Sequence, residues 1–293
     1  MGDFLSAMVS LNIDQISLEA DMHRSYLMLA CGCSILVLAV FACSSPLNFG
    51  NQDQPAESEL WQAAVDDLRV MTQEQQIPQH LIDPEKPAGE AVFDPNHLLV
   101  PLTHLRLRPG YTLDFVYRFD GMGGRPFLYA REETAPPFGD YDAFQAAVDA
   151  CHDSMAVDRC DYLDYIEADG TAEGFFQWVV LKTMGDQFYL FWHAGYHDAE
   201  IIASRERLDS VVADLASGNF GVPLSAAQRR QALRVDPAPV VTLGEDAVTV
   251  RVIWFTRWGG FNETTYTLSR SAPYRVIGQE TNQLVDYDCG IMF

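Results

Sequence analysis

Two short segments of this chain combine residue types that bind metal ions. The first is the chain's cluster of histidines and carboxylates, which comprises His193, His197, Asp198 and Glu200. Histidines four positions apart bind zinc when both lie on one face of a helix. Here Gly195 separates them and His193 ends an expected strand, so we expect a strand-to-helix loop in which Asp198 caps the helix. A metal-dependent hydrolase using the His193/His197 region is one alternative function.

The second segment is acidic and precedes Gly170. Its carboxylates recur about every three residues, at Asp158, Asp161, Asp164, Glu167 and Asp169. Calcium prefers several oxygen ligands on a flexible loop, but this spacing differs from that of an EF-hand. A solvated acidic edge is therefore the favoured interpretation, and a calcium-stabilised binding module is the other alternative function.

Other motifs point away from known catalytic chemistry. The glycine-rich segment 120–124 lacks the Lys-Ser/Thr of a phosphate loop and leads into a strand, so we expect a hairpin turn. The nucleophile signatures Gly-x-Ser-x-Gly and Ser-x-x-Lys are absent from the sequence. No catalytic, cofactor-binding or metal-ligating residue is therefore assigned.

Aromatic residues offer a binding surface instead. Trp254, Trp258 and Phe261 flank the Gly259-Gly260 turn. Exposed aromatic rings bind sugars or protein partners by stacking and burial. We expect these rings either to form such a surface or to lie in a meander core with one aromatic lid.

The charge of the chain excludes one class of partner. Among 293 residues, 41 are acidic and 19 basic, which gives a formal net charge of −22. Nucleic-acid binding needs clustered basic residues and is not expected. The same sign repels anionic lipid headgroups, so a charged membrane-binding patch is not expected either.

The hydrophobic pattern predicts an α+β fold with antiparallel hairpins and a C-terminal β meander, packed with several amphipathic helices. Ser58 is the expected cap of a first helix over 58–76, in which Leu60, Ala64, Leu68 and Met71 recur at helical spacing. Further helices are expected over 141–152, 198–215 and 225–234. Hairpins are expected over 111–131 and 174–193, and the meander over 240–288.

The N-terminal region carries an export signal. Residues 26–42 lack charge, His23 and Arg24 precede them, and small residues end them. The C-terminal end of this uncharged segment has the sequence Val40-Phe41-Ala42-Cys43. It resembles the lipobox of bacterial lipoproteins, although Phe41 is bulkier than the usual residue at that position.

This resemblance implies a domain organisation and a location in the cell envelope. Residues 1–42 would be a signal peptide, with the true start at Met22, because residues 1–21 lack the basic residues of such a signal. Residues 43–57 would be a tether lipidated at Cys43, and 58–293 a single globular domain. Ser44 in similar Gram-negative lipoproteins permits export to the outer membrane, facing the periplasm. A transmembrane anchor and a cleaved signal without lipid are the alternatives.

An anchor signal without a recognisable catalytic set favours a non-catalytic, envelope-associated protein that binds a protein or carbohydrate partner.

Export would also place the remaining cysteines in an oxidising compartment. Cys151 and Cys160 are close enough in sequence to form a disulfide across a short loop. A disulfide from Cys289 to one of them is the second possibility.

Overall fold

The structure is a computed structural model that describes residues 54–73, 75–83, 85–87, 92–153, 161–192, 197–219 and 221–291. The chain divides into two compact units, Met1–Phe49 and Gly50–Phe293, and every described residue belongs to the second. The expected signal peptide, the start at Met22 and the lipidation site Cys43 lie outside the described residues. No helix of the described part has both the length and the apolar character that crossing a membrane requires.

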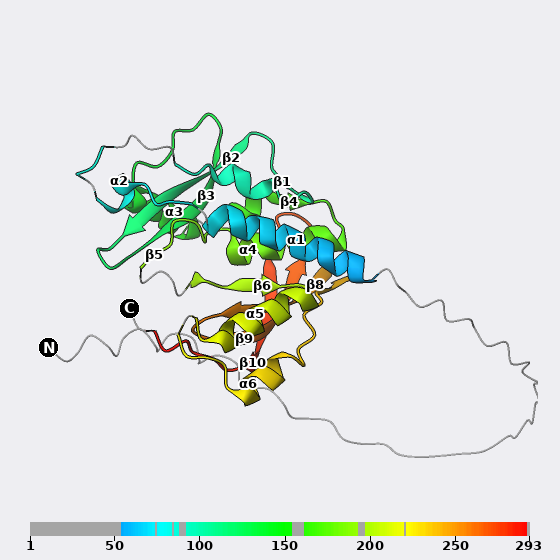
Figure 1. Cartoon of the computed structure of the whole chain (residues 1–293). Helices are drawn as coiled ribbons and strands as arrows, with labels where there is room; N and C mark the ends of the chain where they lie inside the picture. Colours follow the sequence, from blue (N-terminus) through cyan, green and yellow to red (C-terminus); the bar gives the residue numbers. More distant parts are fainter. Residues whose placement is uncertain are drawn as a thin grey trace, which may run out of the picture. The chain divides into compact units, whose positions relative to one another are not determined.

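The described residues form six α-helices and ten strands in antiparallel sheets, which confirms the α+β class (Figure 1). The helices are α1 (Gln54–Gln73), α2 (Gln79–Ile82), α3 (Tyr141–Asp153), α4 (Ala172–Met184), α5 (Arg205–Ser217) and α6 (Ala226–Ala232), with 3-10 helices η1 (Pro95–Leu99) and η2 (Tyr162–Tyr165). The strands are β1 (Leu105–Leu107), β2 (Tyr111–Phe119), β3 (Gly123–Glu132), β4 (Ile166–Ala168), β5 (Phe191–Trp192), β6 (Glu200–Ile202), β7 (Val240–Leu243), β8 (Ala247–Thr256), β9 (Gly260–Ser269) and β10 (Val276–Val285).

The C-terminal meander is present as expected. Strands β8, β9 and β10 pair in sequence, β7 also pairs with β8, and β6 joins the other edge of β8. Val248, Val250 and Val252 are buried on the face that packs against the main core. The alternation of apolar residues therefore predicted which side chains of β8 share the face toward the main core.

Strand β10 is the outer strand of this sheet. Among the described strands it pairs only with β9, and its register shifts at an irregularity near each end. Two side chains of α6 reach its last carbonyl groups, because Gln231 donates to the oxygen of Leu284 and Gln228 to that of Asp286. The rest of the outer edge has no strand partner in the described chain.

The hairpin over 111–131 is also confirmed, as β2 and β3. Its strands pair from Tyr111 opposite Glu132 to Phe119 opposite Gly124. Asp120 holds the turn, because its Oδ1 accepts hydrogen bonds from the backbone nitrogens of Met122 and Gly123. The glycine-rich segment is thus a hairpin turn, and the short strand β5 pairs with the start of β3.

The expected hairpin over 174–193 is wrong. Its first half is the helix α4, which Thr171 caps by accepting a hydrogen bond from the backbone nitrogen of Gly174. Every residue from Gly174 to Leu181 is buried, so the helix has no polar face. Periodicity does not separate a helix buried all round from a strand buried on both faces. The second half contributes only the two-residue strand β5.

The main core forms around α4. This helix contacts α1, β4, β6, β7 and β8. The ring of Phe176 stacks on Trp61 of α1 with centroids 4.8 Å apart, and Phe175 meets Tyr274 edge-on at 5.2 Å. The sheet and α1 therefore both depend on α4 for their packing (Figure 1).

Helix α1 differs from its expected position. It begins at Gln54, before the expected cap Ser58, and Pro55 suits its first turn because proline has a helical φ and needs no donor there. Leu60 is 65% exposed and so lies outside the buried stripe, whereas Ala64 and Leu68 are buried as expected and Met71 packs against the core. The buried residues of α1 are Trp61, Gln62, Ala64, Val65, Leu68 and Thr72.

The segment after His197 also needs correction. Ile201 belongs to strand β6 and not to the following helix. The cap of α5 is Ser204, whose side chain accepts a hydrogen bond from the backbone nitrogen of Arg207. Asp198 therefore does not cap a helix. The helix over 225–234 is confirmed as α6, with Ser225 as its cap.

The packing of α4 against α1 predicts a large effect of truncating Phe176, which is fully buried. We expect Phe176→Ala to lower the free energy of unfolding by about 3–5 kcal/mol, because it leaves a cavity beside Trp61. Leu60→Ala, at an exposed position of α1, should change it by less than about 0.5 kcal/mol. Denaturant unfolding of both variants measures this, and equal effects would contradict the described orientation of α1.

Candidate functional site

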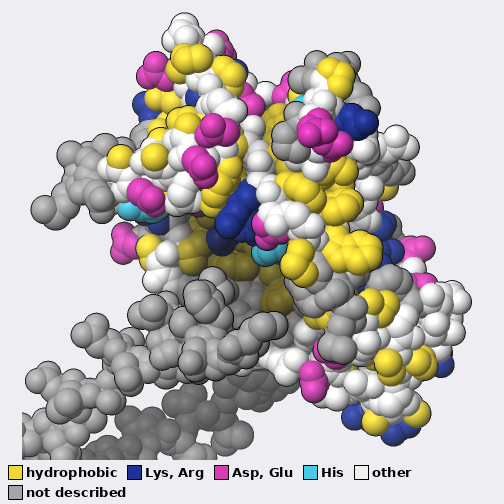
Figure 2. Space-filling view, turned by 90° about the vertical axis from the view of Figure 1, so that its left-hand side faces the viewer, with side chains coloured by type: hydrophobic (Ala, Val, Ile, Leu, Met, Phe, Trp, Pro, Cys, Tyr) yellow, Lys and Arg dark blue, Asp and Glu magenta, His cyan; other side chains and the backbone are white. Residues whose placement is uncertain are grey.

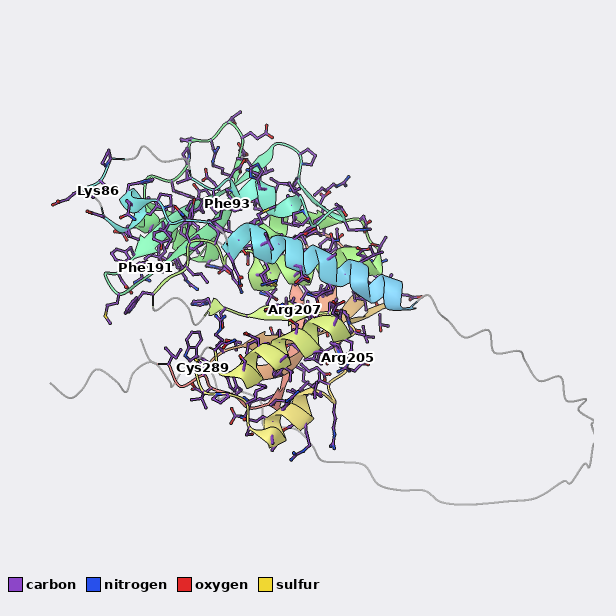
Figure 3. All side chains as sticks on the ribbon, in the orientation of Figure 1. Lys86, Phe93, Phe191, Arg205, Arg207 and Cys289 are labelled. Carbon is purple, nitrogen blue, oxygen red and sulfur yellow. The ribbon has the colours of Figure 1, made fainter. Side chains whose placement is uncertain are left out.

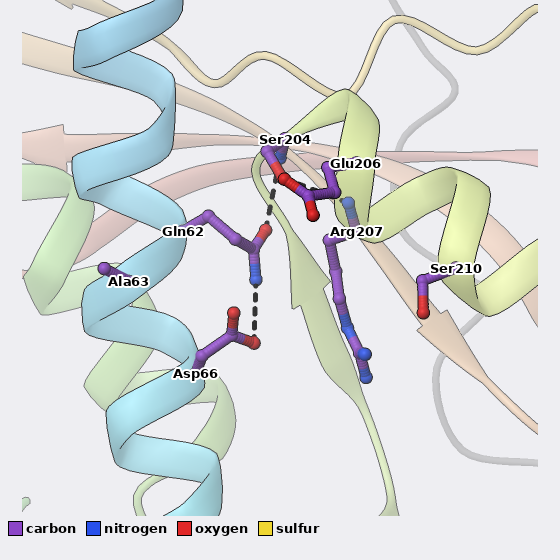
Figure 4. Close-up of a pocket in the computed structure, with 7 residues that line it drawn as sticks. All are labelled: Gln62, Ala63, Asp66, Ser204, Glu206, Arg207 and Ser210. Carbon is purple, nitrogen blue, oxygen red and sulfur yellow. Dashed lines mark hydrogen bonds between the residues drawn. The ribbon is translucent and has the colours of Figure 1, made fainter.

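A polar groove runs between α1 and α5, beside strand β6 (Figure 3). Its first part has a volume of about 430 Å³ and is lined by Gln62, Asp66, Ser204, Glu206, Arg207 and Ser210 (Figure 4). Its second part has a volume of about 350 Å³ and is lined by residues that include Arg69, Gln73, Asp198, Glu200 and Arg257. The two parts adjoin because Arg207 and Ser210 line both. We call the whole the α1–α5 groove.

Gln62 joins the two walls of the groove. Its side-chain oxygen accepts hydrogen bonds from the backbone nitrogens of Ala203, at 2.7 Å, and Ser204, at 3.1 Å. Its amide nitrogen donates to Asp66 Oδ1 at 3.2 Å (Figure 4). Since Gln62 is only 5% exposed, these bonds fix α1 against the start of α5.

Two arginines and one glutamate form the charged floor of the groove. Arg207 binds Glu200 with two donors, Nε and Nη2, the latter at 2.9 Å from Oε2. Arg69 Nε lies 4.0 Å from Glu200 Oε1, and Arg69 Nη2 lies 3.6 Å from Asp66 Oδ1. The forked Arg207–Glu200 pair therefore ties β6 to α5, and Arg69 brings α1 into the same network.

One donor of this network has no acceptor. Arg69 Nε is buried and makes no hydrogen bond to the described residues. A buried donor without an acceptor is unfavourable by about 1–3 kcal/mol, and the charge of the Glu200 carboxylate, 4.0 Å away, offsets part of this cost. The groove thus offers a guanidinium donor, nearby carboxylates and the Ser210 hydroxyl to a polar ligand.

Asp198 lies at the far end of the groove. Its carboxylate accepts hydrogen bonds from the Thr256 hydroxyl and from the backbone nitrogen of Arg257, the latter at 3.1 Å. Burial raises the pKa of Asp198, although these hydrogen bonds and the Arg257 charge act in the opposite direction. Asp198 therefore holds the end of β8 against the segment before β6.

His197 contacts an arginine of the β2–β3 hairpin. Arg125 Nη1 lies 3.0 Å from its Nε2 atom. Burial and the Arg125 charge both lower the pKa of His197, so the ring is neutral at neutral pH. Burial also raises the pKa of the nearby Asp186 carboxyl, which the Arg125 charge opposes. Basic and histidine side chains gather in a hollow on the side of the molecule that Figure 2 shows.

The expected metal cluster is only partly described, because His193 lies outside the described residues. Asp198 accepts hydrogen bonds from Thr256 and Arg257, and Glu200 binds Arg207. Within the described ranges, no group of three or more histidine, cysteine or acidic side chains is arranged to hold a metal ion. The carboxylates near His197 thus have partners of other kinds.

The acidic segment has local structural roles where it is described, while Asp158 lies outside those residues. Asp161 and Asp164 form a capping box at η2. Glu167 binds Arg106, with 2.8 Å between Oε2 and Nη2. Asp169 Oδ2 lies 2.8 Å from His104 Nδ1. These four carboxylates therefore diverge to separate partners.

The aromatic residues around the Gly259-Gly260 turn do not form an exposed surface. Phe261 is fully buried and packs against Phe255 with ring centroids 4.8 Å apart. Trp254 and Trp258 are half-buried, and each indole nitrogen donates a hydrogen bond, to the Thr264 hydroxyl and to the Ile291 oxygen respectively. The interpretation as a core is correct here.

The cysteines are described in part. Cys289 is buried and free, so the structure excludes a disulfide from this residue. Cys151 is disulfide-bonded. Its expected partner Cys160 lies outside the described residues, and the Cys151–Cys160 pairing stays a prediction.

Sequence reasoning missed the groove. Arg69, Glu200 and Arg207 come from a helix, a strand and another helix, and no short motif contains all three. Asp198 and Glu200 were singled out, but as candidate metal-binding carboxylates. A second local signal is on α5, where Arg207 and Ser210 are three residues apart and so share a face. His104, which lies between Asp169 and Glu173, was also missed.

Comparison with known proteins adds no relative: no family model, no curated protein and no solved structure matches this chain.

The pKa of Asp186 predicts a pH effect on stability. Its folded-state pKa is raised above 3.8 by burial, so the folded state binds more protons than the unfolded state in the window just above that value. The free energy of unfolding therefore falls as pH rises through this window. We expect Asp186→Asn to remove that fall and to be more stable than the native chain near neutral pH.

Denaturant unfolding over a pH series measures this effect. Asp209→Asn, at an exposed position on α5, is the control and should leave the pH profile unchanged. An unaltered profile in Asp186→Asn would show that burial does not act on this carboxyl as described.

Proposed function

We propose that this chain is a lipid-anchored, extracytoplasmic binding protein of the bacterial cell envelope, and that its ligand occupies the α1–α5 groove. The observation that carries the binding part is the polar groove itself, whose lining includes the charged side chains of Arg69, Glu200 and Arg207. The ligand is a small polar molecule, or a short polar segment of a protein or carbohydrate, that presents oxygen acceptors to the arginines of the groove. The size of the groove and the oppositely charged groups along it support such a ligand.

The anchoring part rests on the sequence Val40-Phe41-Ala42-Cys43, which resembles a lipobox. Lipid on Cys43 would hold the protein at the membrane, because two or more acyl chains give stable attachment. Only ten residues separate Cys43 from the start of α1 at Gln54. Since an extended chain spans at most about 3.6 Å per residue, the anchored domain stays within roughly 40 Å of the membrane surface.

The anchor is tested by metabolic labelling with a palmitate analogue. The native chain should acquire the label, and Cys43→Ala should lose it and no longer partition with membranes. Cys289→Ala is the matched control and should keep the label, since Cys289 is buried and free. Undiminished labelling of Cys43→Ala would exclude Cys43 as the attachment site.

The groove is tested by filling it. Ser210 is exposed and lines both parts of the groove, so we expect Ser210→Trp to obstruct the ligand without unfolding the protein. Asp209→Trp, one position away on α5 and also exposed, is the control. Full-length protein purified from its own envelope is analysed by native mass spectrometry for a bound molecule.

The native chain and Asp209→Trp should retain the bound molecule, and Ser210→Trp should lose it by at least roughly tenfold in occupancy. Equal occupancy in the two tryptophan variants, or no bound molecule in any of them, counts against a ligand in the groove. This readout is independent of the labelling result, so anchoring and binding fail or succeed separately.

A further inference from the structure

Two arginines face each other across the β2–β3 hairpin. Arg118 of β2 is the direct partner of Arg125 of β3, so both side chains lie on the same face of the sheet. Like charges at directly opposite positions destabilise a sheet. This pair therefore needs compensation from its surroundings.

Aromatic rings supply part of that compensation. The guanidinium of Arg118 lies over the ring of Tyr141, 5.0 Å from its centroid, and that of Arg125 lies over Phe127 at 4.5 Å. The rings of Phe127 and Tyr141 are themselves 4.8 Å apart. Such stacking holds each planar cation in place. Arg125 Nη1 lies 3.0 Å from His197 Nε2, and the other guanidinium donors of the two arginines make no hydrogen bond to the described residues.

Carboxylates do not complete the compensation. Neither Arg118 nor Arg125 forms an ion pair with any acidic side chain of the described residues, in a chain with 41 acidic residues. Asp120 is near Arg118, but its Oδ1 accepts the two backbone hydrogen bonds of the turn. Asp186 is near Arg125 and its charge attracts the guanidinium, but the two groups form no ion pair.

The same end of the hairpin carries exposed apolar side chains. Met122 in the turn is 63% exposed and Trp192 of β5 is 59% exposed. Trp192 is the direct partner of Gly123, two residues before Arg125, so the register places it on the face that carries both arginines. A tryptophan beside two cations is the combination found at the interface between a membrane and water.

We propose that Arg118, Arg125 and Trp192 bind the phosphate groups of an anionic lipid surface, so that the β2–β3 hairpin end of the domain rests on the membrane. The two guanidiniums donate to headgroup phosphate oxygens, and the Trp192 and Met122 side chains enter the interfacial layer. This surface is separate from the α1–α5 groove and goes beyond the proposed binding function.

The negative net charge of the chain does not prevent this contact. Charges are screened over about 8–10 Å at physiological ionic strength, so a surface that touches the membrane acts mainly through its own residues. The expectation that an acidic chain lacks a charged membrane-binding patch thus applies to the surface as a whole. At this hairpin end the local charge is set by Arg118 and Arg125.

The test uses the full lipidated protein reconstituted in vesicles, with an environment-sensitive fluorophore on Met122→Cys. We compare vesicles of phosphatidylcholine alone with vesicles that also contain phosphatidylglycerol. Anionic vesicles should shift the emission to shorter wavelength, and high salt should reverse the shift. Arg118→Gln should lower the ratio of membrane-bound to unbound hairpin ends, measured by the emission shift, by about fivefold. Arg118→Gln/Arg125→Gln should lower this ratio by about fivefold again.

Arg229→Gln/Arg230→Gln on α6 is the matched control, because both arginines are exposed and distant in sequence from the hairpin. It should keep the full shift. Hydrogen exchange of residues 118–125 in the unlabelled native chain provides a second measurement, with slower exchange expected on anionic vesicles alone. A shift of equal size on both vesicle types, or one that survives loss of both arginines, overturns the proposal. Competition by free inorganic phosphate, at an ionic strength too low to reverse the shift by screening, would also overturn it, since that result indicates a site for a soluble anion.

Discussion

The packing of this domain depends on the burial of α4, which is complete from Gly174 to Leu181. A helix without a polar face must be covered on all sides, and here α1, the meander and the β1–β4 pair supply the cover. The burial of so many apolar side chains in one helix stabilises the fold, since each removes apolar surface from water. The position of α1, and hence of one wall of the groove, follows from its contact with this helix through Trp61.

The groove exists because its two walls, α1 and α5, pack against different elements of the fold. Helix α1 packs on α4, whereas α5 packs on the opposite face of the meander in a second core with Ile253 and Phe255. The space between them is bridged by polar groups, with Gln62 at one end and the Arg207–Glu200 pair in the middle. Side chains that hold the walls together therefore also line the space that a ligand would enter.

Much of this fold could be predicted from the sequence, because alternation and turn residues act locally. The meander, the β2–β3 hairpin and α6 with its Ser225 cap are examples. Whether the apolar segment of α4 forms a helix or a strand could not be predicted, since burial on all sides removes the periodicity that distinguishes the two. Thr171, three residues before Gly174, was the available signal for a helix start. The groove depends on contacts such as Gln62 to Ala203, which are far apart in sequence and leave no local pattern.

The outer strand β10 has a consequence for how copies of this protein behave when crowded. An open sheet edge is a template for pairing with another chain, and such pairing leads to aggregation. Strand β10 departs from regular pairing near both ends, and α6 occupies the carbonyl groups at its end. Only a short straight stretch of edge therefore remains for a neighbour to extend. Copies of the protein at high concentration are therefore less prone to join their sheets through this edge.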